Sequence, residues 1–146
     1  MKAAGRVEIA ASPEDVWAFL LDPQRVGPCL PGVEAIERLE DGRFRARARV
    51  GGGLFSTVVE IVGGYEDLDP PRGATLTGRG TGIFGSSHVT ARFELEPGAG
   101  GGTIVSWTAE VTLAGLAATL EGRLADGTAD RAVAGVLDCV RARLEA

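Results

Sequence analysis

A short glycine-rich string is the first feature of the chain that suggests chemistry. The string GTGIFG at residues 80–85 matches the pattern GxGxxG, which in dinucleotide-binding proteins brings a pyrophosphate to the N-terminus of a helix. That use requires a helix after the third glycine, whereas residues 89–95 alternate apolar and polar side chains, as a strand does. We therefore expect a hairpin between two strands. Phe84 at its tip is a candidate for gating a ligand, for touching a bilayer, or for folding back onto the domain.

His88 is the single histidine, and its neighbours Ser86, Ser87 and Thr90 suggest a nucleophilic site. Such a site needs a base that a third group orients. Alternation instead places His88 on the outer face of its strand, opposite Val89. We therefore expect a surface histidine and no catalytic residue. No metal site and no cofactor are expected either, since one histidine and two distant cysteines lack the spacing of metal ligands.

The two cysteines, Cys29 and Cys139, lie far apart in the sequence. Cys29 precedes a Leu-Pro-Gly string, a position that would suit a reactive thiol at a helix end, yet cysteine usually behaves as a small buried hydrophobe. We expect both cysteines to be buried free thiols. The chain begins without a charged segment followed by an apolar run, so we expect a cytoplasmic protein.

A row of like charges is the most unusual charge feature of the sequence. Arg43, Arg45, Arg47 and Arg49 alternate with apolar residues and so share one face of a strand. Four like charges on one face repel each other unless neighbouring strands supply carboxylates. The candidates for that pairing are Glu34, Glu40 and Glu60. Two interpretations remain open: a solvated face with cross-strand ion pairs, and a docking patch for an acidic partner.

The elements that position these residues follow from the hydrophobic pattern. Residues 3–10 have the period of a half-buried strand, and Ser12 before Pro13 predicts the start of a helix. An Asp-Pro pair at 22–23 interrupts that helix, and a short second helical turn is expected up to about Gly27. From Val33 the period is two for about eighty residues, with repeated turn signals, as in an antiparallel meander.

Apolar residues at spacings of three and four between Leu116 and Leu144 predict a long amphipathic helix that closes the chain. We therefore expect one α+β domain over residues 1–146 with a helix-grip fold. In this fold a seven-stranded antiparallel sheet curls around the C-terminal helix, and two short helices follow the first strand. With 22 glycines and only 5% aromatic residues, large side chains are few, so we expect a cavity between sheet and helix.

The composition excludes several classes of function. A chain of 146 residues with 45% hydrophobic and 24% charged residues is typical of a globular domain and not of a disordered one. Its net charge of −5 repels phosphate backbones and anionic lipids. We therefore expect no nucleic-acid partner and at most transient contact with a membrane. No segment approaches the roughly 18 apolar residues of a membrane-spanning helix.

Several local strings, in a fixed order, resemble those of one protein family. They are DP at 22–23, CLPG at 29–32, DPP at 69–71, the glycines at 78, 80 and 82, GGT at 101–103 before Trp107, and GLA at 115–117. Over nearly the whole chain they resemble the carbon monoxide dehydrogenase G-subunit-like family of the START/Bet v 1-like (SRPBCC) superfamily. The resemblance implies an accessory protein that binds a lipophilic molecule. It also implies a molybdenum hydroxylase of the carbon monoxide dehydrogenase type as partner, at or near the inner membrane face.

Three functions remain open at this point. A carrier would hold a lipid or quinone type of molecule between sheet and helix. An enzyme of the polyketide cyclase or hydratase kind would need a polar cluster in the pocket, and the predicted inner face offers only Thr57. A docking module would recruit its partner through the arginine row or the glycine hairpin, with the cavity filled by side chains. We favour the carrier, and its predicted ligand-lining residues are Phe44, Phe55, Val59, Phe84, Phe93, Trp107, Leu116, Leu120 and Leu124.

Overall fold

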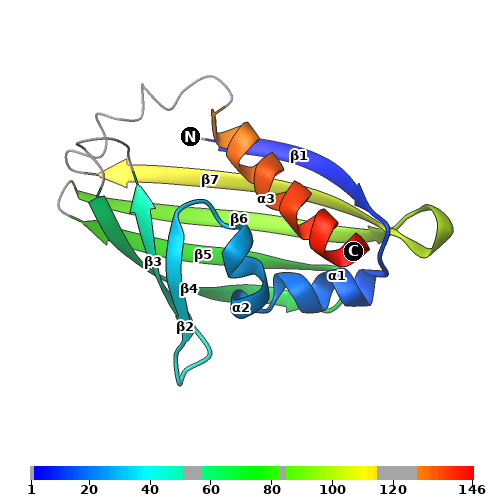
Figure 1. The fold of residues 1–146 in the computed structure, drawn as a ribbon, viewed down its shortest axis with the longest axis horizontal. Helices are drawn as coiled ribbons and strands as arrows, with labels where there is room; N and C mark the ends of the chain where they lie inside the picture. The colour runs from blue at the N-terminus through cyan, green and yellow to red at the C-terminus, as the bar shows by residue number, and fades with distance from the viewer. Residues whose placement is uncertain (1, 51–56, 83–84, 115–127) are drawn as a thin grey trace.

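The computed structural model describes residues 2–50, 57–82, 85–114 and 128–146, and within these ranges the chain forms a seven-stranded antiparallel sheet with helices on one side (Figure 1). The strands are β1 (Lys2–Ile9), β2 (Val33–Arg38), β3 (Phe44–Val50), β4 (Thr57–Asp69), β5 (Gly73–Gly82), β6 (Gly85–Pro97) and β7 (Thr103–Ala114). The helices are α1 (Pro13–Leu20), α2 (Pro23–Val26) and α3 (Thr128–Glu145), with the 3₁₀ turns η1 (Gly27–Cys29) and η3 (Ala99–Gly101). The α+β helix-grip arrangement predicted from the sequence is confirmed.

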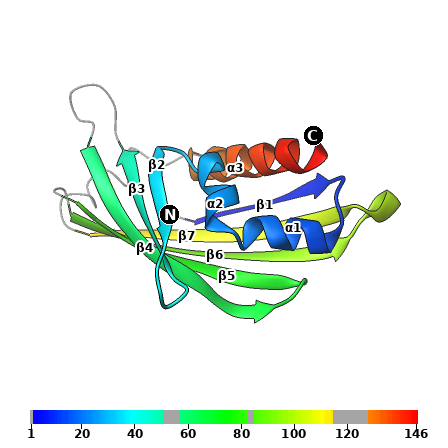
Figure 2. The same ribbon diagram turned by 60° about the horizontal axis from the view of Figure 1, so that its bottom comes forward.

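The strand order is β1-β7-β6-β5-β4-β3-β2, so β1 and β2 are the two edges of the sheet. Figure 2 shows α1, α2 and α3 on the same side, while β2 and β3 rise toward that side at one end. The helical side is therefore the concave face. Helix α3 packs mainly on β1 and also touches η1 and α1, so it lies over one edge of the sheet.

Side-chain caps set the starts of the two short helices. The hydroxyl of Ser12 accepts a hydrogen bond from the backbone N–H of Asp15 at 3.2 Å, and Pro13 occupies the first turn of α1. The carboxylate of Asp22 accepts from the N–H of Gln24 at 3.0 Å and begins α2. Both starts agree with the sequence prediction. None of the helices in the described part of the chain is long and apolar enough to cross a membrane.

The buried core lies between the helices and the part of the sheet formed by β1, β7 and β6. Its most buried side chains include Ile9, Val16, Phe19, Leu95, Val105, Trp107, Leu137 and Val140. The indole of Trp107 on β7 lies over Gly5, its register partner on β1. A Cβ atom on Gly5 would stand 2.6 Å from Cζ2 of Trp107, so the large ring needs a residue without a side chain beneath it.

The two cysteines form a disulfide, and their Cα atoms are 5.5 Å apart. The prediction of two free thiols is therefore wrong. The prediction of burial is confirmed for Cys29, which is 9% exposed, whereas Cys139 is half-buried. The pair is separated by 110 residues in the sequence. It forms because α3 packs against η1, and no local pattern in the sequence predicts this tertiary contact.

The glycine string belongs mostly to regular strands. Gly80 and Gly82 lie in β5, Gly85 lies in β6, and Gly82 pairs with Gly85 across the two strands. The hairpin prediction is confirmed, and no helix follows the third glycine, as a dinucleotide site would require. Phe84 lies outside the described residues. The predicted C-terminal helix is confirmed over Thr128–Glu145, while Leu116, Leu120 and Leu124 also lie outside the described residues.

Two glycine substitutions should have opposite effects on stability. Gly5→Ala places a methyl group against the ring of Trp107, so we expect it to lower the free energy of unfolding by about 1–3 kcal/mol. Gly135→Ala in α3 meets no heavy atom within 4 Å and should raise it by up to about 1 kcal/mol through helix propensity. Urea denaturation of both variants measures this. If Gly5→Ala has the same free energy of unfolding as the unaltered protein, Trp107 moves aside at no cost.

Tyr65 on β4 links the sheet to α1 and should make stability pH-dependent. Its hydroxyl donates a hydrogen bond to the carbonyl of Leu20 at 3.0 Å, and burial, assisted by the charge of Asp22, raises the pKa of Tyr65 to about 12. An unfolded tyrosine ionises near pH 10. The stability that Tyr65 contributes is therefore complete below pH 10 and is lost as the pH rises through 12.

The test uses the fact that Tyr65 is the single tyrosine of the chain. Tyrosinate absorbance of the folded protein should rise with a midpoint near pH 12. The Tyr65→Phe variant should lack the part of the stability loss that lies between pH 10 and pH 12. A midpoint near pH 10 in the folded protein would contradict the burial of this hydroxyl.

Candidate functional site

The concave face of the sheet is the surface on which most of the predicted ligand-lining residues were expected. Register partners share a face, and one row crosses five strands through Ala46, Ile61, Gly80, Ser87 and Leu113. Adjacent rows add further small and aliphatic side chains on the same side. The alternation of apolar and polar residues in the sequence produces this face, because successive side chains of a strand point to opposite sides.

The concave face has two halves. One is packed against the helices, and the side chains of the other are only half-buried. Beneath α1 and α3, the side chains of β1, β7 and the far end of β6 belong to the core. Nearer the open end of the sheet lie aliphatic side chains that are only partly buried and stand outside that core cluster. These side chains are Val59, Ile61, Leu76, Val89, Ala91 and Leu113. The second half is an apolar surface that the described helices do not cover.

The structure divides the predicted ligand-lining residues between the two halves. Trp107 is 8% exposed and belongs to the core, and its register partner Phe93 packs on Trp17 with ring centroids 6.1 Å apart. Phe44 is 7% exposed and packs on Tyr65 at the same centroid distance of 6.1 Å. Val59 lies on the half-buried half. Three other predicted residues are in the segment 115–127, and Phe55 and Phe84 likewise lie outside the described residues.

Polar groups on the concave face are few and mostly engaged. The hydroxyl of Thr103 is buried and donates to the carbonyl of Ala11 at 2.7 Å, and Tyr65 donates to Leu20. Thr57 and Ser87 are half-buried hydroxyls near the open end. Among the described positions in register with Ala46 on this face, none carries a carboxylate, imidazole, ammonium or guanidinium group. The described part of this row therefore lacks an acid–base pair for proton transfer.

His88 is exposed on the convex face, as predicted. Its register partners there are Arg79 on β5 and Thr112 on β7, and neither of these is a base that would orient it for catalysis. Within the described residues, no three histidine, cysteine or acidic side chains come close enough together to hold a metal ion.

The arginine row is exposed on the convex face and is largely paired with carboxylates. Arg43 binds Asp41 at 2.7 Å, and Arg49 binds Glu34. Arg45 contacts Glu37 at 3.0 Å and Glu60 at 3.6 Å. The predicted partners Glu34 and Glu60 are therefore confirmed. Glu37 and Asp41 were missed, because the bulge between Val33 and Ala35 and the tight turn at Gly42 decide which carboxylates face the row. Glu40 forms no ion pair with the described residues.

Arg47 is the exception in the row, since no carboxylate of the described chain pairs with it, although Glu60 is its register partner. Arg79 on β5 is a second exposed arginine without such a pair. It lies in a groove of about 950 Å³ on the convex face, together with His88, Thr77 and Thr90. Sequence reasoning missed Arg79 because it stands between glycines that were assigned to a hairpin.

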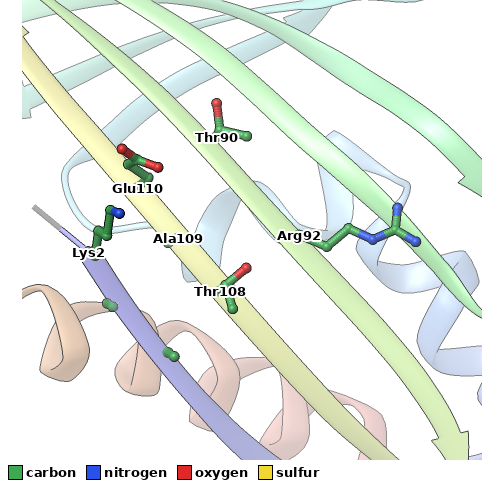
Figure 3. A pocket seen from close by; sticks show the side chains of 8 residues that line it. Lys2, Thr90, Arg92, Thr108, Ala109 and Glu110 are labelled. Carbon is green, nitrogen blue, oxygen red and sulfur yellow. The ribbon is translucent and has the colours of Figure 1, made fainter.

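A second hollow of about 430 Å³ lies on the same convex face, across β1, β7 and β6. Figure 3 shows the register partners Lys2 and Glu110 next to each other, while the guanidinium of Arg92 points away from them. Arg92 instead donates to the carbonyl of Asp67 at 3.2 Å and lies 3.8 Å from Glu94. Because the charges in this hollow are of both signs, it offers no concentrated charge to a ligand.

Solved structures of other proteins share this fold. A conserved protein from Geobacillus kaustophilus matches with a TM-score of 0.87 and 20% identity, over 99% of this chain and 95% of that one. A START superfamily protein from Mycobacterium smegmatis matches with a TM-score of 0.73 and 14% identity, over 99% and 97%. A point mutant of norcoclaurine synthase from Thalictrum, in complex with a transition state analogue, matches with a TM-score of 0.67 and 16% identity, over 99% and 93%.

No curated protein sequence matches the chain. The family model of CoxG, the G subunit of carbon monoxide dehydrogenase, matches residues 5–145. That range includes the sheet, the short helices and α3, and the fold it implies agrees with the START-like architecture of the solved structures. The chain therefore belongs to the CoxG family, named after this component of carbon monoxide dehydrogenase.

Proposed function

We propose that this protein is a carrier that holds a hydrophobic molecule of lipid or quinone type on the half-buried part of its concave face. The observation that supports the proposal most strongly is the chemistry of that surface. Its side chains are mostly aliphatic and only partly buried by the described residues, the arginine row lies on the convex face, and Arg38 at its β2 border is paired with Asp22 at 3.8 Å. Burying such a surface against an apolar ligand is favourable by about 25 cal/mol per Å².

Glycines on β5 support the same proposal, because they leave room for the side chains of the neighbouring strand. A Cβ on Gly78 would lie 3.4 Å from Cγ2 of Ile61, and one on Gly82 would lie 2.8 Å from Cγ1 of Val59. Val59 and Ile61 therefore rest against the backbone of β5 and leave the concave side open. Of the predicted lining residues, Val59 borders this surface, with Phe44 and Phe93 on adjoining rows. The remaining members of the predicted set stay part of the proposal.

Family membership supports a partner of the carbon monoxide dehydrogenase type, a molybdenum hydroxylase. The arginine row Arg43, Arg45, Arg47 and Arg49 is the candidate docking patch. The ion pairs within the sheet reduce the number of these arginines whose charge is available to a partner. Three of these guanidinium groups already neutralise carboxylates of this chain. Arg47 and Arg79 carry charges that no described carboxylate neutralises. We assign them the main role in attracting an acidic surface of the partner.

We place the carrier in the cytoplasm, in transient contact with the inner membrane face. A hydrophobic cargo requires access to a lipid surface, and the net charge of −5 keeps contact with anionic lipids weak. The disulfide is unusual for this compartment, where thiols are kept reduced. The redox state of Cys29 and Cys139 therefore tests whether the protein works in the cytoplasm.

Filling the concave face should abolish ligand uptake. Ala91 is half-buried at the centre of this face on β6, and Ala91→Trp adds a large side chain where the ligand is proposed to lie. We expect binding of the neutral apolar probe N-phenyl-1-naphthylamine, measured by fluorescence, to weaken about tenfold or more, equivalent to ~1.4 kcal/mol.

The matched control is Thr112→Trp, which adds the same side chain to the exposed convex face of β7. This variant should bind the probe as the unaltered protein does. If a folded Ala91→Trp variant takes up the probe normally, the ligand does not lie between the sheet and the helices.

Reversing the charges of Arg47 and Arg79 should weaken partner binding without unfolding the protein. For Arg47→Glu combined with Arg79→Glu, we expect the association rate with the molybdenum hydroxylase to fall about tenfold at low salt, with a smaller effect at high salt. Biolayer interferometry at two salt concentrations measures this. Arg143→Glu, an exposed change in the last turn of α3, is the control and should have no effect on binding.

Arg45→Glu separates docking from sheet stability. This change breaks the contacts of Arg45 with Glu37 and Glu60, so it should lower the melting temperature more than the Arg47→Glu, Arg79→Glu double variant does. If the double variant melts earlier and still binds the enzyme normally, these arginines serve the sheet alone.

A further inference from the structure

The disulfide joins the two edges of the curled sheet. Cys29 ends η1, which leads into the edge strand β2, and Cys139 lies in α3, which packs on the opposite edge strand β1. The sheet, η1 and α3 therefore form a closed ring around the concave face, and the Cys29–Cys139 bond is the covalent link that completes it. The cysteines are separated by 110 residues, and the segment between them contains the strands β2 to β7.

On the β2 side, the cysteine is held firmly to the sheet. Gly27 in η1 packs closely on Ile36 of β2, where a Cβ would lie 3.1 Å from Cγ2 of the isoleucine. The carbonyl of Gly32 accepts a hydrogen bond from the N–H of Arg49 on β3 at 2.7 Å. Cys29 is therefore expected to move together with the β2–β3 edge.

On the β1 side, α3 is held by apolar packing against the core. Among the described side chains of this helix, Leu137 at 7% exposure and Val140 at 0% are the buried ones. A hollow of about 220 Å³, lined by Trp107, Ala134 and Leu137, lies between α3 and β1. Near the end of the helix, the carboxylate of Glu145 accepts from the N–H of Ala10 at 3.3 Å. The disulfide adds the covalent part of the contact between α3 and η1.

We propose that the Cys29–Cys139 disulfide is a redox-controlled latch that retains the ligand when oxidised and releases it when reduced. The proposal rests on the carrier function above and names how that surface is regulated. With the bond intact, the two edges stay together over the concave face. With the bond broken, α3 and the β2–β3 edge separate more readily, and the apolar surface exchanges its ligand faster.

The redox step is thiol–disulfide exchange with a dithiol reductant. One thiolate of the reductant attacks a sulfur of the disulfide and forms a mixed disulfide, and its second thiol then displaces the remaining cysteine. The Cys29–Cys139 bond breaks, both cysteines become thiols, and the reductant becomes a disulfide after giving up two electrons and two protons. Cys139 is half-buried, which leaves its side of the bond partly open to a reductant.

The experiment measures the release of N-phenyl-1-naphthylamine from the protein into phosphatidylcholine vesicles by stopped-flow fluorescence. Oxidised protein is compared with protein reduced by dithiothreitol, and both with the Cys29→Ser, Cys139→Ser double variant. We expect release to be about tenfold faster after reduction, a barrier change of ~1.4 kcal/mol. The double variant should release the probe at the fast rate with or without dithiothreitol, because the chain has two cysteines and no other target for the reductant.

Each outcome decides between the two proposals. Probe binding with equal release rates in the oxidised and reduced protein overturns the latch and leaves the carrier standing. No probe binding in either state contradicts the carrier itself. Circular dichroism checks the fold: loss of the sheet signal on reduction also overturns the latch, since the disulfide would then serve stability alone. Slow release from the double variant overturns it in the same way.

Discussion

An antiparallel sheet with one apolar face must remove that face from water, and the described helices of this protein cover only part of it. Helix α3 lies over β1, and α1 lies near the same end, so the core forms there around Trp107 and Val105. At the other end, aliphatic side chains such as Ile61 and Val89 remain half-buried. The proposed ligand surface, the packing of α3 on the sheet and the position of the disulfide all depend on this incomplete coverage.

The separation of charge between the two faces is the second consequence of the strand period. Every arginine of the row points outward because Phe44, Ala46 and Ala48 point inward and are buried. The proposed apolar ligand would therefore lie on the face opposite the arginine row. The outward charges remain available for ion pairs within the sheet and for a partner. Most are used within the sheet, as the contacts of Arg45 with Glu37 and Glu60 show.

Related structures show how little of the sequence this architecture requires. The Geobacillus protein has the same fold at 20% identity, and the norcoclaurine synthase mutant has it at 16%. The second of these is an enzyme by its description, so the fold by itself does not decide between binding and catalysis. In this chain the distinction depends on which groups face the concave side. Among the described residues, the hydroxyl of Tyr65 there is hydrogen-bonded to Leu20, and Arg38 is paired with Asp22.

Periodicity and helix-capping residues in the sequence determined the strands, the starts of α1 and α2, the outward position of His88 and the shared face of the arginine row. These features depend on residues close in sequence, through side-chain alternation and helix capping, so they could be predicted from local sequence patterns. The same patterns also predicted Phe44, Phe93 and Trp107 as inward-facing residues. Local reasoning did not separate Trp107, which packs on Gly5, from Val59, which lies beyond the core, because coverage depends on where α3 crosses the sheet.

Only the tertiary structure decided the disulfide, the pairing of Glu37 and Asp41 with the arginine row, and the position of Arg79. Cys29 and Cys139 meet because sheet curvature brings the β2 edge toward α3, across a separation of 110 residues. Glu37 faces Arg45 because a bulge in β2 shifts the register, and Arg79 faces His88 because Gly78 and Gly80 continue a strand. Curvature, bulges and register are set by the packing of whole elements, and for that reason no local pattern in the chain encodes them.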